Sequence, residues 1–204
     1  MTAVKICGLF RSCDVEWVNE AGPDYAGFIL QYPKSHRNVT VQQAKALREK
    51  LAPGIRAVGV FVDRPAEEIA EAADIIGLDV IQLHGSEDSL FIEALREKTG
   101  LPVWKAFRVR APGDLAEAGE SPADGILLDG GLGSGSLFDW SLIGSFGRPF
   151  FLAGGLTPEN IPEAVRRLSP ALVDLSSGVE TEKKKDREKI LAAVRAARGA
   201  GDNN

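Results

Sequence analysis

Three features of the 204-residue sequence predict an α/β fold, specifically a (β/α)8 TIM barrel built as one compact single domain. Eight short apolar runs of strand type recur at a nearly constant spacing, which is typical of one supersecondary unit used repeatedly. Helix-like segments separate these runs, and such alternation indicates a parallel sheet with helices outside it. The residues after the first run do not form the G-x-G-x-x-G fingerprint of a doubly wound sheet, so the barrel is preferred.

The strands are predicted where short apolar runs lie between turn-forming residues. In chain order they cover residues 4–7, 25–30, 57–62, 80–83, 103–107, 126–129, 150–153 and 173–176. Eight strands in a chain of this length leave short connections, so the barrel should lie near the small end of the range for its fold.

Capping residues mark the starts of several helices. Thr40 is a predicted N-cap for the segment 41–51, and Thr157 with Pro158 is predicted to open the segment 158–168. The other helices are predicted over residues 66–73, 88–99 and 186–197.

One connection and the end of the chain have weaker helix signals. The segment 110–122 is rich in glycine, proline and alanine, so an irregular connection is expected there. The barrel domain is predicted to span residues 1–198, and residues 199–204 are expected to form a flexible C-terminal tail.

Charge and composition exclude several functional classes. The formal net charge is −5 and no basic stripe is visible, so no nucleic-acid partner is expected. No apolar run is long enough to span a membrane and no leader segment precedes the first strand, so a cytoplasmic protein is expected. With only two cysteines and two histidines and no clustered spacing, no metal site is predicted.

The barrel hypothesis places reactive residues at the carboxyl ends of the strands. The residues found there are Cys7, Arg37, His84, Asp129, Gly154-Gly155 and Ser176-Ser177-Gly178. Loops after the seventh and eighth strands of this fold frequently bind phosphate through exposed backbone amides. A single Gly-Gly pair would favour a simple tight turn, but two such loops on neighbouring strands favour a phosphate site.

Four side chains at this rim have both a functional and a structural interpretation. Cys7 is either a buried packing thiol or a reactive thiolate or proton acceptor, and the two alternatives are evenly balanced. Asp129 closes an apolar run, where a carboxyl group costs free energy unless it is hydrogen-bonded or functional, so a catalytic acid is favoured over a loop cap. His84 is either a hydrogen-bonded core residue or a catalytic one. Arg37 is either a surface arginine or a bidentate clamp for a carboxylate.

A series of short motifs extends along nearly the whole chain, from Val4 to Ala197. In order they are Lys5-Ile6-Cys7-Gly8, Gly27-Phe28-Ile29, Ser35-His36-Arg37, Val58-Gly59-Val60-Phe61, Gln82-Leu83-His84-Gly85, Leu127-Leu128-Asp129, Gly133-Ser134-Gly135, Phe138-Asp139-Trp140, 152–156 and 174–180. Each motif alone is weak, but the series in this order resembles the phosphoribosylanthranilate isomerase family. Two positions differ from that family, which usually has proline at His36 and Lys-Thr at Ser136-Leu137.

The resemblance implies an enzyme of tryptophan biosynthesis that isomerises N-(5′-phosphoribosyl)anthranilate by an Amadori rearrangement. It makes Cys7 the general base and Asp129 the general acid, and Arg37 the residue that holds the anthranilate carboxylate. The resemblance assigns phosphate binding to the backbone around Gly154, Gly155, Ser177 and Gly178. His84, at the same rim, is predicted to be a substrate-binding residue as well. The implied partner is a small phosphoribosyl substrate, the implied assembly is a monomer or homodimer, and no cofactor is needed.

Three alternatives compete with this assignment. A sister isomerase of the histidine pathway would carry Asp in place of Cys7 and would need sites for two phosphates. A metal-dependent pentose-phosphate epimerase would require His and Asp ligands at the strand ends, which are missing. A non-catalytic phosphate-binding barrel would keep both glycine loops but would need neither Cys7 nor Asp129, so their joint presence favours an enzyme.

Overall fold

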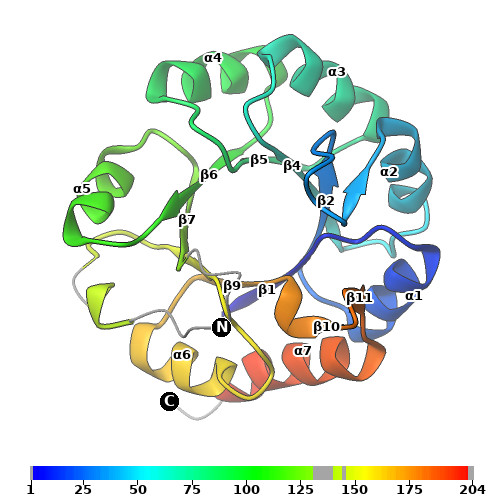
Figure 1. Cartoon of the computed structure of the whole chain (residues 1–204), viewed down its shortest axis with the longest axis vertical. Helices are drawn as coiled ribbons and strands as arrows, with labels where there is room; N and C mark the ends of the chain where they lie inside the picture. Colours follow the sequence, from blue (N-terminus) through cyan, green and yellow to red (C-terminus); the bar gives the residue numbers. More distant parts are fainter. Residues whose placement is uncertain (1, 131–139, 144–145, 202–204) are drawn as a thin grey trace.

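Eight parallel strands close into a barrel in the computed structural model of the chain, which describes residues 2–130, 140–143 and 146–201 (Figure 1). The barrel strands are β1 (Ala3–Cys7), β2 (Tyr25–Leu30), β4 (Arg56–Phe61), β5 (Val80–Leu83), β6 (Val103–Arg108), β7 (Gly125–Asp129), β8 (Phe151–Ala153) and β9 (Leu172–Leu175). The ring closes because β1 pairs in parallel with both β2 and β9. The predicted fold class and all eight predicted strands are confirmed.

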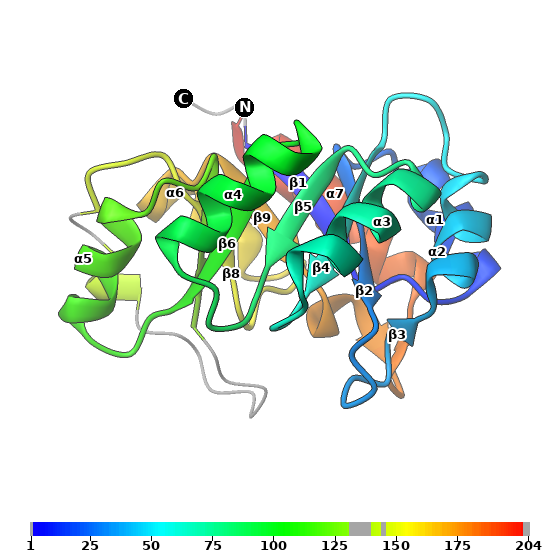
Figure 2. The ribbon, with the colours of Figure 1, turned by 90° about the horizontal axis from the view of Figure 1, so that it is seen from above.

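Helices surround the ring of strands (Figure 1). They are α1 (Ser12–Ala21), α2 (Val41–Arg48), α3 (Ala66–Ile76), α4 (Ser89–Thr99), α5 (Pro112–Glu120), α6 (Ile161–Leu168) and α7 (Arg187–Gly201). The shorter elements are β3 (Asn38–Val39), η1 (Trp140–Leu142), η2 (Ser177–Val179), β10 (Glu180–Thr181) and β11 (Lys184–Lys185). In Figure 2, β3 lies below the ring, at the end where the strands finish.

The connection between β6 and β7 corrects one prediction. Instead of an irregular segment over 110–122, the chain forms the helix α5. The Asp114 carboxylate accepts hydrogen bonds from the backbone N–H groups of Arg110 and Ala111, over 2.7 and 2.9 Å. Pro112 occupies the start of the helix, where its missing N–H costs nothing. These two local features outweigh the poor helix propensity of the glycines.

The start of α6 corrects a second prediction. Thr157 and Pro158 do not open the helix, because residues 158–160 form a turn and α6 begins at Ile161. The side chain of Asn160 accepts a hydrogen bond from the Thr157 N–H and donates one to the Gly155 carbonyl, over 2.8 and 2.9 Å. The turn therefore belongs to the loop that follows β8.

Other helix ends differ from the predictions by a turn or less. The helix α2 ends at Arg48 instead of residue 51, and α3 extends to Ile76, where Gly77 adopts a left-handed conformation with φ of 72°. The helix α7 continues to Gly201, past its predicted end and into the segment expected to be a tail. The rest of that tail, residues 202–204, lies outside the described residues.

The barrel interior follows the two-residue period of the strands, because successive side chains of a strand point to opposite faces. At the amino end of the barrel the inward residues form a buried apolar cluster of Tyr25, Val58, Val80, Trp104 and Leu172. The larger core lies between the strands and the helices and includes Phe28, Phe61 and Ile126.

Some predicted motifs fall on residues that the structure does not describe. The motif Gly133-Ser134-Gly135, the dipeptide Ser136-Leu137 and the residues Phe138-Asp139 lie in the segment 131–139, outside the described residues. Among the described helices, none has the length and apolar character needed to cross a membrane.

Candidate active site

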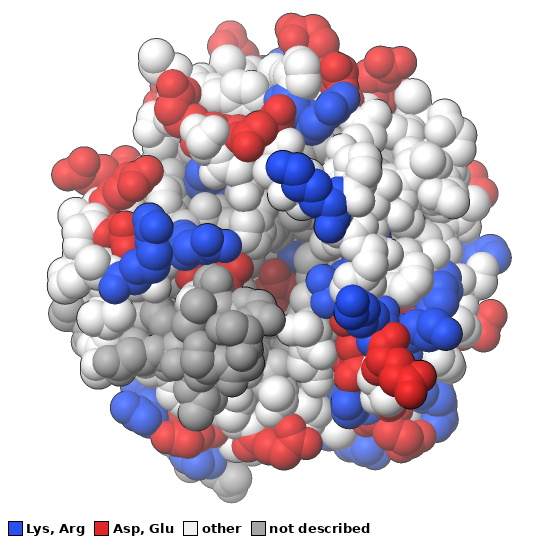
Figure 3. Space-filling view, in the orientation of Figure 1, with Lys and Arg blue, Asp and Glu red and all other residues white. Residues whose placement is uncertain are grey.

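A cavity of about 270 Å³ opens at the carboxyl end of the barrel. The face shown in Figure 3 is hollowed at its centre, with Lys and Arg side chains standing around the hollow. Its lining includes every site residue predicted from the sequence, namely Cys7, Arg37, His84, Asp129, Gly154, Gly155, Ser177 and Gly178. The strand order of the closed barrel thus brings together residues that are far apart in the sequence.

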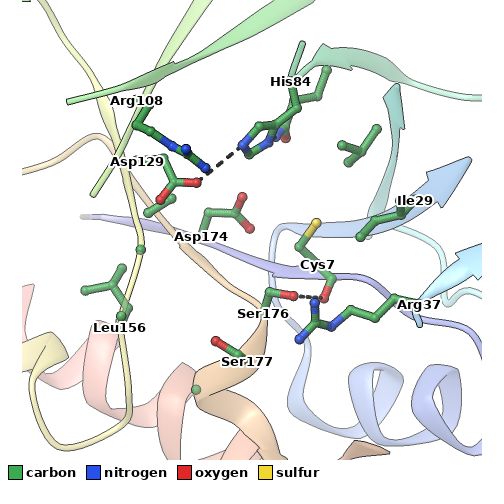
Figure 4. A pocket seen from close by; sticks show the side chains of 16 residues that line it. Cys7, Ile29, Arg37, His84, Arg108, Asp129, Leu156, Asp174, Ser176 and Ser177 are labelled. Carbon is green, nitrogen blue, oxygen red and sulfur yellow. Dashed lines mark hydrogen bonds and ion pairs between the residues drawn. The ribbon is translucent and has the colours of Figure 1, made fainter. Parts of the chain in front are cut away.

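Cys7 and Asp129 reach the cavity from opposite sides (Figure 4). Cys7 is the last residue of β1 and Asp129 the last residue of β7, so each side chain lies where its strand ends. Asp174, on β9, points into the space between them. A thiol and a carboxyl group on two sides of one cavity can transfer protons to and from different atoms of the same ligand.

Cys7 is buried, and its surroundings act on its thiol in two directions. Burial raises the pKa of Cys7, whereas the positive charges of Lys5 and Lys185 lower it. The net shift is upward, because the cost of removing the thiolate from water exceeds the stabilisation that these charges provide. The hydroxyl of Ser176 donates a hydrogen bond to the Cys7 carbonyl over 3.2 Å, which holds the end of β1 against the loop after β9.

His84 lies beside the proposed acid. Its Nε2 atom is 3.3 Å from Oδ2 of Asp129, and its Nδ1 atom is 3.5 Å from the side-chain nitrogen of Gln82 (Figure 4). His84 is therefore not a buried core residue, because 39% of its side chain is exposed at the cavity. It is placed to orient the Asp129 carboxyl group.

Arg37 reaches the cavity from the segment between β2 and β3, and it is already paired with a carboxylate. Its Nε and Nη2 atoms donate hydrogen bonds to the two carboxylate oxygens of Glu180, over 2.6 and 2.7 Å. Two of the five N–H groups of a guanidinium serve these bonds, and the others can still hold a ligand carboxylate. Glu180 thus fixes the direction in which Arg37 presents its free edge.

Glu180 also connects this arginine to the loop after β9. The buried Lys185 donates hydrogen bonds to Glu180 and to the Ser176 carbonyl, over 2.7 and 2.9 Å. Burial raises the pKa of Glu180, but the bonds from Arg37 and Lys185 lower it to about 2. The carboxylate therefore stays charged, and one network of hydrogen bonds joins Arg37 to the loop after β9.

The glycines after β8 and β9 are required by the backbone itself. Gly154 has φ of 89°, and a side chain at this position would collide with Asp129 and Gly130. A Cβ atom on Gly178 would overlap the backbone carbonyl of Leu156 in the neighbouring loop. Only glycine therefore allows these two loops to approach each other, and the approach leaves their backbone amides at the cavity.

Several residues of the cavity and its supporting network were missed at the sequence level. They are Gln82, Arg108, Asp174, Glu180 and Lys185. The first three could have been predicted from the alternation of side chains along a strand. Each lies an even number of positions away from other inward-facing residues of its strand, so its side chain must also face the barrel interior. Glu180 and Lys185 lie on the β10–β11 hairpin, and no pattern in the sequence pairs them with Arg37. Among the described residues, no group of three or more His, Cys, Asp or Glu side chains is placed to hold a metal ion.

The fold and this cavity define the general class, a (β/α)8-barrel enzyme with its working groups at the carboxyl ends of the strands. The sequence model of the family described as N-(5'phosphoribosyl)anthranilate (PRA) isomerase matches residues 4–196. The chain belongs to this family.

Individual relatives agree with this assignment over nearly the full length of the chain. The N-(5'-phosphoribosyl)anthranilate isomerase of Endomicrobium trichonymphae is 44% identical over 203 residues, which cover 97% of this chain and 99% of the relative. A solved structure of monomers of the dimeric enzyme of Thermotoga maritima superimposes with a TM-score of 0.87 at 37% identity, covering 98% of this chain and 100% of that one. A phosphoribosylanthranilate isomerase in complex with reduced 1-(o-carboxyphenylamino)-1-deoxyribulose 5-phosphate gives a TM-score of 0.86 at 36% identity, with the same coverage.

Proposed function

We propose that Cys7 and Asp129 are the general base and the general acid of the reaction that this family catalyses. The chain is an isomerase of tryptophan biosynthesis, which converts N-(5′-phosphoribosyl)anthranilate to 1-(2-carboxyphenylamino)-1-deoxyribulose 5-phosphate. The observation that supports the two roles is that both side chains line one cavity, from the ends of β1 and β7.

The first step opens the ribose ring. The protonated carboxyl group of Asp129 gives its proton to the ring oxygen, and the bond from that oxygen to C1′ breaks. The lone pair of the anthranilate nitrogen forms a C1′–nitrogen double bond, which yields a Schiff base. His84 lies against the carboxyl group that must perform this transfer, so we assign it a positioning role.

The second step moves the double bond. The Cys7 thiolate accepts the proton from C2′, and the electron pair of that C–H bond forms a double bond between C1′ and C2′. The electron pair of the C1′–nitrogen double bond returns to nitrogen, giving an enolamine that tautomerises to the ketone. The substrate's own nitrogen serves as the electron sink, so no cofactor is proposed.

Substrate binding is proposed to use the two ends of the cavity. The free edge of Arg37 holds the anthranilate carboxylate, as a guanidinium can do in a bidentate manner. The backbone around Gly154, Gly155, Ser177 and Gly178 holds the 5′-phosphate, with the amides of two adjacent loops supplying the donors. The one phosphate site of this proposal matches a substrate with one phosphate.

The test is turnover of freshly prepared N-(5′-phosphoribosyl)anthranilate, followed by the loss of its fluorescence with a chelator present. Asp129→Asn and Cys7→Ser should each lower kcat by at least about 100-fold, the range in which a general acid or base contributes. Both variants should bind a reduced product analogue nearly as well as the parent chain. Near-parental kcat in both variants would make the assignment of the acid and the base wrong.

Three further properties are part of the proposal. We infer a single domain over residues 1–198, a cytoplasmic location, and a monomeric or homodimeric state, the last because one relative is described as dimeric. Sedimentation equilibrium over a range of protein concentrations tests the oligomeric state, and a stable mass above that of a dimer would contradict it.

A further inference from the structure

We propose that Lys5 is a positioning residue for the base, and that its buried ammonium group stabilises the thiolate of Cys7 at the floor of the cavity. This inference rests on the role proposed above for Cys7. Lys5 is fully buried inside the barrel, so its charge acts on its neighbours with little screening by water.

The strands bring the two side chains to the same place. Lys5 and Cys7 alternate on β1, so both point to the inside of the barrel. Beside them on β2 lies Gly27, which pairs with Cys7 in the parallel ladder. A Cβ atom built on Gly27 would lie 2.9 Å from the sulfur of Cys7 and 3.1 Å from Cε of Lys5. The thiol and the end of the lysine side chain therefore converge on the space that a glycine leaves free.

Two neighbours keep Lys5 charged and fixed in direction. Its Nζ atom donates hydrogen bonds to Oδ2 of Asp174 on β9 and to the side-chain oxygen of Gln82 on β5, over 2.8 and 2.7 Å. Burial lowers the pKa of Lys5, but the charge of Asp174 raises it above its ordinary value. The lysine is therefore a cation at neutral pH, held on β1 by residues from two other strands.

Other ionisable groups also face the surroundings of Cys7. Arg37, His84, Arg108, Asp129 and Asp174 line the same cavity, and Lys185 lies behind it; of these, Asp174 and Lys185 act on the pKa of Cys7. Among the charges that act on the pKa of Cys7, Lys5 has the largest effect, ahead of Asp174, which raises the pKa, and Lys185, which lowers it. Lys5 is thus the charge that most strongly opposes the effect of burial, which disfavours the thiolate.

The composition of the chain makes the test direct, because Cys7 and Cys13 are its only cysteines. In a Cys13→Ser background, the ultraviolet absorbance of the thiolate, followed against pH, reports Cys7 alone. Lys5→Met should move the titration midpoint to higher pH, and Lys5→Arg, which keeps the charge, should restore it at least partly. The pH profile of kcat should move in the same alkaline direction. A midpoint that rises by about one pH unit lowers the thiolate fraction at neutral pH by about tenfold.

Lys105→Met is the matched control. Lys105 is also a buried lysine on a barrel strand, but it lies on the outward face of β6, opposite to Trp104 and Arg108, where it is bound to Glu87 over 2.7 Å and to the Gly85 carbonyl over 2.6 Å. Its removal should lower stability, as the loss of one partner of a buried ion pair does, but should leave the Cys7 titration in place. An equal change of the midpoint in Lys105→Met, or no change in Lys5→Met, would overturn the proposal.

Lys5→Met leaves Asp174 as an unpaired buried charge, which can prevent folding. The double variant with Lys5→Met and Asp174→Asn removes both charges and keeps the experiment decisive. Since Lys5 acts on Cys7 more strongly than Asp174 does, the midpoint should still move upward. The titration does not depend on turnover, so it separates a failure of this inference from a failure of Cys7 as the base, which Cys7→Ser reveals through kcat.

Discussion

The two ends of the barrel are built from the same strands, but the amino end is packed with apolar side chains and the carboxyl end holds a polar cavity. At the amino end, the rings of Tyr25, Trp104 and Phe151 stack edge to face, with centroids 4.8 and 4.7 Å apart, and the guanidinium of Arg56 lies 4.0 Å from the Tyr25 ring. At the carboxyl end, the inward positions of these strands carry a thiol, carboxylates, an arginine and glycines around an open cavity.

The difference shows how one fold separates stability from function. Aromatic rings fill the amino end and bury a large apolar area, which stabilises the barrel. The carboxyl end contains buried charges and open glycine loops, which cost free energy through desolvation and backbone entropy but arrange the groups for chemistry. Variants at the two ends should therefore affect different measurements.

The largest effect on stability is expected at the amino end, for Trp104→Ala. Removing this buried ring should lower the free energy of unfolding by about 3–5 kcal/mol, because the barrel cannot collapse to fill the space. Urea unfolding measures the loss, and kcat per folded molecule should stay close to that of the parent chain. Leu90→Ala, at a side chain that is 75% exposed, is the control and should change stability little. A large fall in kcat without a loss of stability would contradict the division between the two ends.

At the carboxyl end, Arg37→Ala should act mainly on substrate binding and leave turnover nearly unchanged, with a smaller loss of stability because Glu180 loses one of its two cationic partners. A hydrogen bond to a charged group is worth about 1.5–3 kcal/mol, so KM should rise by roughly 10- to 100-fold with a small change in kcat. Lys34→Ala, an exposed residue of the same loop, is the control. Steady-state kinetics measure KM and kcat of both variants. An unchanged KM in Arg37→Ala would contradict the proposal that Arg37 binds the anthranilate carboxylate.

The variant Glu180→Gln tests whether ion pairs at the carboxyl end also contribute to the stability of the fold. The pKa of Glu180 is lowered from 4.5 to about 2, so the stabilising effect is complete above 4.5 and is lost as the pH falls toward 2. Between pH 4.5 and 2, the free energy of unfolding of the parent chain should fall by about 2 kcal/mol more than that of Glu180→Gln. Unfolding by urea at a series of acidic pH values measures this difference. Parallel curves for the two chains would show that the pairing with Arg37 and Lys185 adds no net stability.

The smallest effect is expected for His36→Pro, which introduces the residue usual in the family. The Nε2 atom of His36 lies 3.6 Å from Oε2 of Glu180, and its side chain is 37% exposed. Partly exposed pairs contribute at most about 1 kcal/mol, so both KM and the free energy of unfolding should change little. A KM increase as large as that of Arg37→Ala would mean that His36 itself helps to hold the carboxylate.

Much of the site could be predicted because the barrel converts strand ends into a single rim. Once the strands are placed, Cys7, His84 and Asp129 must meet at the carboxyl end. The interior side of β1 could be predicted in the same way, because Lys5 and Cys7 are two residues apart. The start of α6 could not, since Asn160 satisfies the backbone around Thr157 and the helix begins later.

The sequence by itself determined the order of strands, the inward face of each strand and the identity of the groups at its end, because these depend on local period and composition. Only the tertiary structure decided which charges meet. Arg37 and Glu180 are 143 positions apart, and Lys5 and Asp174 are 169 positions apart. The closure of β1 against β9 brings Lys5 to Asp174, and the hairpin after β9 carries Glu180 to Arg37. Ion pairs form between residues that are close in space, whatever their separation in the sequence, so they produce no periodic sequence pattern. The direction of Arg37 and the charged surroundings of the Cys7 thiol are therefore set by the tertiary structure and could not be predicted from the sequence.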